Sequence, residues 1–266
     1  MATNRKPSPG FAQHPDYSLR LEACPRRIRV EFAAAIVADS TDARYLFESR
    51  RLPVYYIPWC DLRIDLLEKT ALSTHCPFKG NASYWNIIVG DVVAENAVWA
   101  YEEPYLEVPE LEGLAAFYWD CVDHWYEEDE EIFVHPRDPY SRTDVIPSSR
   151  EVKIELASEV IARSTRAMFV FETGLPTRYY LPREDVRMDL LTPSASHSRC
   201  PYKGIASYWS ASIGGRHHKD IAWSYPDPVP ECPKIKGLVA FYNENVDTIF
   251  VDGRPVEKPH TMWSKD

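Results

Sequence analysis

The chain contains the same long sequence twice. The segment CPFKG that begins at Cys76 recurs as CPYKG from Cys200, an offset of 124 residues. The same offset carries ASYW from Ala82 onto ASYW from Ala206. More than a third of the positions between 30 and 123 are identical to those between 154 and 247, with no gap. A unit of this length is far longer than a solenoid repeat, so we expect each copy to be a whole domain.

The duplication divides the chain into three predicted parts. Residues 1–26 are rich in proline and are expected to be an irregular tail. Residues 27–147 form the first predicted domain and residues 148–266 the second, with linker composition in the run IPSS at 146–149. A short linker favours domains that pack on each other, as they would about a pseudo-twofold axis.

The residue pattern is that of antiparallel strands. Residues 28–32 alternate between apolar and polar, pause, and resume at 36–37, which predicts a hairpin. Residues 83–89 are rich in aromatic and β-branched side chains, and a turn at Gly90 leads to a returning strand at 97–101. We expect two tandem antiparallel β domains, each with roughly seven to nine short strands.

Two further segments complete this interpretation. Residues 114–119 and 122–126 are expected to form a last hairpin around Asp120. Residues 61–67 fit either a helical turn or a short strand. No segment carries an amphipathic helical period over three turns.

Charge and hydropathy exclude several classes of protein. A net charge of −10 argues against a nucleic-acid binder and against docking on anionic lipid. No apolar run approaches the roughly 20 residues of a membrane helix. Arg5 and Lys6 are not followed by an apolar core, so no secretory signal is recognised and a cytoplasmic location is predicted.

The cysteine pattern predicts no disulfide framework. Six cysteines in a reducing compartment remain thiols, and only Cys76 and Cys200 match between the copies. A zinc site needs paired ligands, and no histidine matches either. We therefore expect no disulfide, no metal and no cofactor.

The matched polar residues supply candidates for catalysis. Lys79 follows Cys76 by three residues, and a nearby ammonium lowers the pKa of a thiol. Matched aspartates beside Arg63 resemble an acid/base pair with an anion clamp. The alternatives are a cysteine packed at a tight turn and aspartates that cap turns. The catalytic candidates are Cys76, Cys200, Lys79, Lys203, Asp61 and Asp185.

Matched aromatic residues are the strongest sign of a ligand site. Their number exceeds what a small core requires, and their OH and NH groups need partners when buried. They fit either an aromatic pocket in each copy or a closed core. The predicted ligand-binding residues are Tyr56, Arg63, Tyr84, Trp85, Trp99 and Tyr101, with Tyr180, Arg187, Tyr208, Trp209, Trp223 and Tyr225 in the second copy.

Several long motifs resemble those of a known family. VYYIP from Val54, THCPFKG from Thr74 and AENAVW from Ala94 are similar to motifs of domain-of-unknown-function family 427, in a tandem two-copy form. The resemblance implies a small β domain, β-tent-like, without a settled activity. Its nucleotidyltransferase-like label would require a carboxylate pair for metal and a phosphate loop, and the sequence has no P-loop.

Three functions follow from this interpretation. The first is binding of a small molecule in an aromatic pocket of each copy. The alternatives are an enzyme that uses the same pocket for acid/base or thiol chemistry, and a protein-interaction module with no small ligand. An open pocket with polar groups would favour the first two, and a filled aromatic core the third. The oligomeric state is left open.

The copies differ at one turn. The second has Arg183-Glu184 beside its aspartate where the first has Trp59-Cys60. A charged pair can bind an anion or shift a neighbouring pKa, whereas Trp and Cys only pack. We therefore predict that the two copies differ in function and that the second is closer to a functional site. The alternative is that both pairs are surface turn residues.

Overall fold

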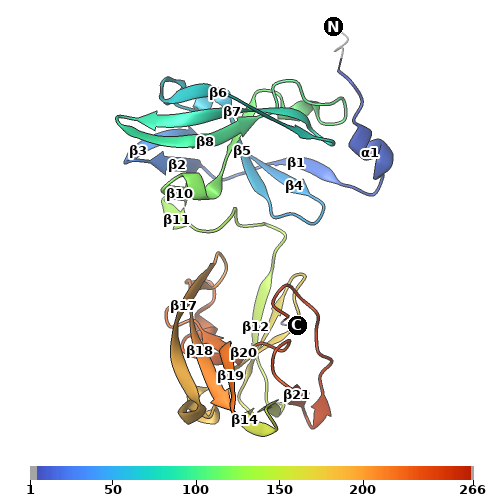
Figure 1. Cartoon of the computed structure of the whole chain (residues 1–266), viewed down its shortest axis with the longest axis vertical. Helices are drawn as coiled ribbons and strands as arrows, with labels where there is room; N and C mark the ends of the chain where they lie inside the picture. Colours follow the sequence, from blue (N-terminus) through green and yellow to red (C-terminus); the bar gives the residue numbers. More distant parts are fainter. Residues whose placement is uncertain (1–4, 265–266) are drawn as a thin grey trace. The chain divides into compact units, whose positions relative to one another are not determined.

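The computed structural model describes residues 5–264, which divide between Asp138 and Pro139 into two compact units (Figure 1). Each unit is a mostly β domain with two antiparallel sheets, as the sequence predicts. The described residues hold eleven strands in each domain, more than the seven to nine expected.

The first domain opens with a short helix, α1 (Pro9–Gln13), which Ser8 caps. Its strands are β1 (Leu19–Ala23), β2 (Ile28–Phe32), β3 (Ala35–Ser40), β4 (Arg44–Glu48), β5 (Val54–Pro58), β6 (Leu67–Cys76), β7 (Gly80–Val89), β8 (Val92–Ala100), β9 (Leu114–Phe117), β10 (His124–Glu127) and β11 (Glu130–Ile132). Four 3₁₀ turns join them: η1 (Trp59–Asp61), η2 (Ile64–Leu66), η3 (Pro109–Leu111) and η4 (Trp119–Cys121).

The second domain repeats this order. Its strands are β12 (Thr143–Pro147), β13 (Val152–Leu156), β14 (Glu159–Ser164), β15 (Met168–Glu172), β16 (Arg178–Leu181), β17 (Leu191–Cys200), β18 (Gly204–Ile213), β19 (Arg216–Ser224), β20 (Val239–Phe241), β21 (Thr248–Val251) and β22 (Arg254–Pro255). Its 3₁₀ turns are η5 (Arg183–Asp185), η6 (Met188–Leu190) and η7 (Pro233–Ile235).

The strand order confirms the duplication. The seven-stranded sheet of the first domain runs β1-β4-β5-β9-β8-β7-β6, and that of the second runs β12-β15-β16-β20-β19-β18-β17. The smaller sheets run β11-β10-β2-β3 and β22-β21-β13-β14. Corresponding strands occupy corresponding places, so each sequence copy has folded as a complete domain.

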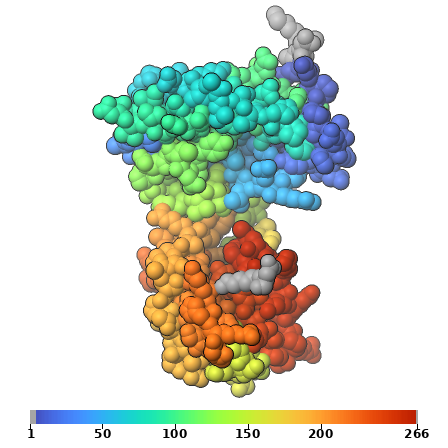
Figure 2. Space-filling model, viewed as in Figure 1, coloured from blue at the N-terminus to red at the C-terminus, as the bar shows by residue number. Residues whose placement is uncertain are grey.

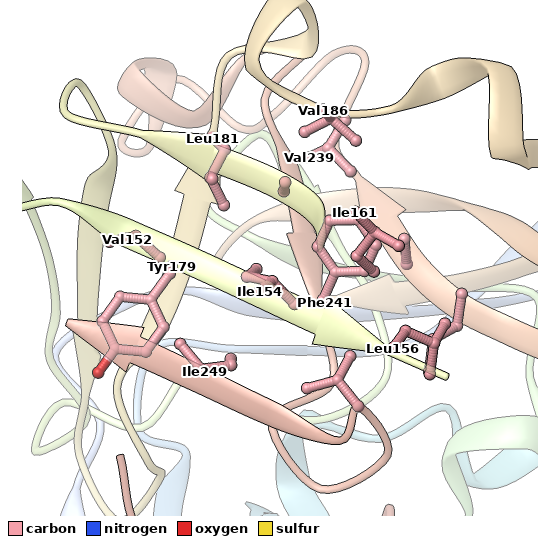
Figure 3. Close-up of a cluster of buried hydrophobic side chains, with 14 of the residues drawn as sticks. Val152, Ile154, Leu156, Ile161, Tyr179, Leu181, Val186, Val239, Phe241 and Ile249 are labelled. Atoms are coloured by element: carbon pink, nitrogen blue, oxygen red, sulfur yellow. The ribbon is translucent and has the colours of Figure 1, made fainter. Parts of the chain in front are cut away.

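The main core of each domain lies between its two sheets. In β2 the side chains alternate between buried and half-buried, and the buried ones meet residues of the larger sheet such as Ile57. Figure 3 shows the same arrangement in the second domain, where Ile154 and Ile249 of the smaller sheet face Leu181 and Phe241 of the larger. This core binds the two sheets into one unit.

A second core covers the other face of the seven-stranded sheet. In the first domain it lies beneath the long connection between β8 and β9. We call it the outer cluster; its buried members are Leu46, Tyr56, Ala82, Tyr84, Tyr101, Val108, Leu111 and Ala116. The outer cluster of the second domain consists of Val170, Tyr180, Ala206, Trp223, Tyr225, Cys232, Ile235 and Ala240.

The domain boundaries differ from those predicted. The division falls between Asp138 and Pro139 rather than after Pro147. Strand β12 pairs with β15 and so belongs to the second domain, and β1 pairs with β4 although residues 1–26 were expected to be irregular. Both edge strands mix polar and apolar residues in short runs, which is why their pattern is weak.

The expected hairpin around Asp120 is wrong. Strand β9 belongs to the seven-stranded sheet and β10 to the four-stranded sheet. Turn η4 carries the chain from one sheet to the other, and Trp119 stacks on Trp125 in the intervening core with ring centroids 4.6 Å apart. The ambiguous segment 61–67 lies largely in 3₁₀ turns, with β6 beginning at Leu67.

Candidate functional site

Strand alternation divides the predicted ligand residues between two faces. Tyr84 points into the outer cluster, whereas its neighbour Trp85 lies in the main core, where Trp59 meets it edge-on at 4.8 Å. The second domain repeats the division, with Trp209 in the main core and Tyr208 against the outer cluster. Tyr84 and Trp85 therefore do not line one common site.

A matched hydrogen bond fixes two outer-cluster rings. The indole Nε1 of Trp99 donates to the hydroxyl of Tyr56 at 3.1 Å, and Trp223 donates to Tyr180 at 2.9 Å. The rings meet nearly at right angles, at 87° and 89°. Burial raises the pKa of the Tyr56 hydroxyl far above its ordinary value, so it stays protonated.

A buried ion pair lies beside these rings. The ammonium of Lys79 donates to the carboxylate of Glu48, and both side chains are at most 10% exposed. The Lys79 nitrogen also lies 5.6 Å from the ring centre of Tyr101. Lys203 and Glu172 form the same pair in the second domain. The pair joins strand β4 to the turn after β6.

The glycine of the repeated CPFKG motif allows the covering loop to approach this turn. Gly80 has a φ of +108°, a conformation that other residues rarely adopt. A Cβ atom there would lie 3.2 Å from the backbone oxygen of Glu103. Gly204 stands in the same relation to Asp227. The motif is therefore explained by packing of the loop on the turn.

The candidate thiols lie at the edge of the outer clusters. Cys76 and Cys200 are half-buried and pack against them. All six cysteines, which fall within residues 5–264, are free thiols. The ammonium of Lys79, proposed to activate Cys76, is already engaged by Glu48.

The aspartates and arginines of the predicted site lie elsewhere. The hydroxyl of Ser40 donates to Asp61 at 2.6 Å, and Arg63 pairs with the exposed Asp65 at 2.6 Å. The backbone of Arg63 is bonded to Val37 of β3, which places this turn beside the four-stranded sheet. The Arg63 guanidinium holds the pKa of Asp65 below its ordinary value.

The second domain repeats these contacts. Ser164 donates to Asp185 at 2.7 Å, and Arg187 pairs with Asp189 at 2.6 Å. The structure thus brings together six of the predicted first-copy residues and separates them from Asp61, Arg63 and Trp85. The six that meet in the outer cluster are Tyr56, Cys76, Lys79, Tyr84, Trp99 and Tyr101.

The turn that differs between the copies serves packing in both. Trp59 lies against Trp85, and the Arg183 guanidinium lies 5.4 Å from the ring centre of Trp209. Glu184 pairs with Arg166 at 3.2 Å on the exposed surface. Functional inequality of the copies stays a prediction.

Sequence reasoning missed a matched hydroxyl group beside each outer cluster. Thr74 and Tyr84 share a hydrogen bond of 2.7 Å, as Ser198 and Tyr208 do at 2.6 Å. Tyr118 joins the first group, and partial burial together with a hydrogen bond to Tyr84 raises the pKa of Tyr118 to about 12. Tyr118 recurs as Tyr242, so the repeat itself carried the signal.

Residues 6–17 lie along one side of the first domain, where Figure 2 shows them in dark blue at the right. We call residues 6–17 the strap. The backbone of Gly10 donates to the carbonyl of Pro77 at 3.0 Å, and Tyr17 stacks on Phe78 with ring centroids 3.8 Å apart. The hydroxyl of Tyr17 donates to Glu48 at 2.6 Å, so the strap reaches the buried ion pair.

Surface grooves lie apart from the outer-cluster rings. A half-open groove of about 860 Å³ is lined by Arg5, Lys6, His75, Gly80, Asn81, Ser83, Glu102, Glu103, Pro104, Tyr105 and Glu112. A smaller one of about 330 Å³ lies between β12 and residues 231–234. Neither groove is lined by the predicted ligand-binding residues. That those residues contact a ligand therefore stays a prediction.

Neither a metal-binding cluster nor a membrane-spanning helix occurs within residues 5–264. Within residues 5–264 no three His, Cys, Asp or Glu side chains are grouped to hold a metal ion. None of the helices in that part of the chain has the length and apolar character to cross a membrane.

Comparison with known proteins agrees with the internal repeat. No curated protein matches the chain. A family described as a domain of unknown function, DUF427, matches residues 20–128 and again residues 144–252. Each match begins within the edge strand that opens a domain, β1 or β12, and ends just after β10 or β21, before the short final strand. The chain therefore belongs to the DUF427 family and carries two copies of its domain.

Proposed function

We propose that this protein is an interaction module that binds short polypeptide segments on the surface of its β domains. The observation that carries this proposal is the strap. Its backbone and side chains bond to the domain at several points, as a docked peptide does. The domain already holds one short segment of its own chain, which includes helix α1.

The second domain holds a segment in a similar way. The hydroxyl of Thr261 donates to Glu244 at 2.6 Å, and Asn245 donates to the backbone oxygen of Trp263 at 3.1 Å. Residues 6–17 and 261–264 are thus held on domain surfaces by hydrogen bonds and aromatic contacts. Such contacts suit recognition of a partner's chain.

The packing of the outer cluster supports the same function. Tyr56, Tyr84 and Tyr101 are at most 6% exposed, and their neighbours fill the space between them. A small molecule would have to displace these side chains, which protein interiors resist. The groove beside Asn81 is open and polar instead, with carboxylates and cations on its walls.

The test is selection from a random peptide library with the full chain. We expect enriched peptides whose affinity falls at least about tenfold in Asn81→Arg, which places a long side chain in the groove. Ile205→Arg alters the corresponding exposed position of the second copy and should leave binding intact. Absence of peptide binders, together with a metabolite that stabilises the chain and loses its effect in Tyr56→Phe, would favour the small-molecule function.

A further inference from the structure

The second domain contains an internal arginine that is enclosed by aromatic rings. The guanidinium carbon of Arg178 lies 5.7 Å from the ring centre of Trp223, 5.8 Å from that of Tyr242 and 5.4 Å from that of Trp263. Arg178 also forms two hydrogen bonds to Glu244, at 2.6 and 2.7 Å. The side chains of Arg178 and Glu244 are 5% and 0% exposed. Three rings and a carboxylate therefore make a complete guanidinium site.

The first domain carries the same ring pair on the same backbone. The centroids of Trp99 and Tyr118 are 4.6 Å apart with the planes at 41°, against 4.5 Å and 45° for Trp223 and Tyr242. The amide of Tyr118 donates to Ala97 as that of Tyr242 donates to Ile221, in the corresponding register. Two of the three rings are therefore preformed in the first domain.

The first domain has no arginine at the position that corresponds to Arg178. Val54 stands where the second copy has Arg178, and it pairs with Leu46 as Arg178 pairs with Val170. Asp120 stands in the turn position of Glu244 and has no hydrogen-bond or salt-bridge partner within residues 5–264. Tyr118 is 45% exposed. An aromatic face and a carboxylate thus remain accessible at this place.

We infer that the faces of Trp99 and Tyr118, with Asp120, bind the arginine side chain of a protein partner. The inference rests on the proposed function and adds the chemistry of one recognised side chain. Arginine fits better than lysine because a planar guanidinium stacks on rings while it bonds a carboxylate through two N–H groups. A net charge of −10 on the chain also attracts a cationic partner.

The test uses the full chain and a small probe, acetyl-Gly-Arg-Gly-amide, followed by the ¹⁵N signals of the tryptophan indoles. We expect the Trp99 signal, assigned with Trp99→Phe, to shift with a dissociation constant in the millimolar range. The Trp223 signal should not move, because Arg178 occupies its site. The matching lysine peptide should bind at least about fivefold more weakly than the arginine peptide. The matching norleucine peptide, which has no charge, should not bind.

Three variants test whether these residues form the arginine site. Tyr118→Ala should abolish the shift, Asp120→Asn should weaken binding about fivefold, and Val54→Arg should fill the site from within and abolish binding. An unchanged indole signal of Trp85, in the main core of the same domain, shows in each case that the fold of the first domain is intact. No Trp99 shift at about 10 mM probe, or an equal shift with norleucine, would overturn the inference. Library peptides that bind the Tyr118→Ala variant at full affinity would also overturn the inference. They would leave the proposed interaction function in place.

Discussion

Lys79 and Glu48 form an ion pair that is almost wholly shielded from solvent, and Lys203 and Glu172 repeat it in the second domain. The two residues of each pair are 31 positions apart in sequence. Each pair ties strand β4 or β15 to the turn that follows β6 or β17. The position of each pair indicates that it holds the outer cluster closed.

We predict that Lys79→Met strongly destabilises the first domain. It leaves the Glu48 carboxylate buried without its cation, which costs about 3 kcal/mol or more of unfolding free energy. The double variant Lys79→Met with Glu48→Leu should recover most of that loss, since no unpaired charge remains. Lys69→Met, which breaks the exposed pair with Glu102, is the control and should cost under about 1 kcal/mol.

Urea unfolding followed through the amide signals of the first domain measures these changes. Equal losses in Lys79→Met and Lys69→Met would show that the pair is effectively solvated and does not hold the cluster.

The hydrogen bond between indole and phenol should be worth more in the second domain. Tyr56→Phe and Tyr180→Phe each remove the acceptor of a tryptophan N–H. We expect a loss of about 1 kcal/mol for Tyr56→Phe and a larger one for Tyr180→Phe, because Trp223 is only 6% exposed and its N–H cannot reach water. Domain-resolved hydrogen exchange compares the two, and a smaller loss in Tyr180→Phe would contradict the burial argument.

One methyl group added at Gly10 should release the strap from the first domain. A Cβ on Gly10 would lie 2.7 Å from the carbonyl oxygen of Pro77 and from the ring of Phe78, so Gly10→Ala cannot keep its contacts. We expect limited proteolysis to cut residues 6–17 of this variant at least about tenfold faster, since local opening governs cleavage. Gln13→Ala, on the exposed side of α1, should be cut at the wild-type rate. Equal protection of both variants would show that the strap is not held at Gly10.

Acid should weaken the second domain through Glu244. Burial opposes ionisation of this carboxyl, but the hydrogen bonds from Arg178 and Thr261 prevail and hold its pKa below the ordinary 4.5. A lowered pKa contributes stability that is present above 4.5 and is lost as the pH falls through the folded-state value. Glu244→Gln should therefore be less stable at pH 7 and should lose less stability on acidification.

Thermal unfolding of the second domain between pH 7 and pH 3 measures this difference. A slope as steep in Glu244→Gln as in the wild type would assign the acid sensitivity to other carboxyls.

The sequence predicted the duplication and much of the strand pattern. The hairpin of β7 and β8 around Gly90 follows from its aromatic and β-branched runs. Strand β6 escaped notice because most of its side chains are exposed, so it carries no alternation of buried and polar residues. The crossing from β9 to β10 was misread as a hairpin because two short apolar runs separated by a turn look the same whether or not they share a sheet.

The candidate site was less predictable than the fold. Period-two alternation alone places Tyr84 and Trp85 on opposite faces. The sequence could not show that both faces are covered, since the loop over the outer cluster has no regular pattern. Comparison of the copies did find Lys79, but its pairing with Glu48 depends on the register of strands far apart in the chain. The open ring pair at Tyr118 needed the structure of the second domain, where Arg178 shows what fits there.

The central claim is that the first domain binds a partner's polypeptide on its surface rather than a small molecule in its outer cluster. The most direct measurement is chemical-shift mapping of a library-selected peptide on the full chain. We predict that the shifts gather at surface positions of the first domain, at Asn81 and Ser83 of the groove and at Trp99 and Tyr118. Shifts centred on the buried Tyr56 and Tyr101, or confined to the second domain, would contradict the account.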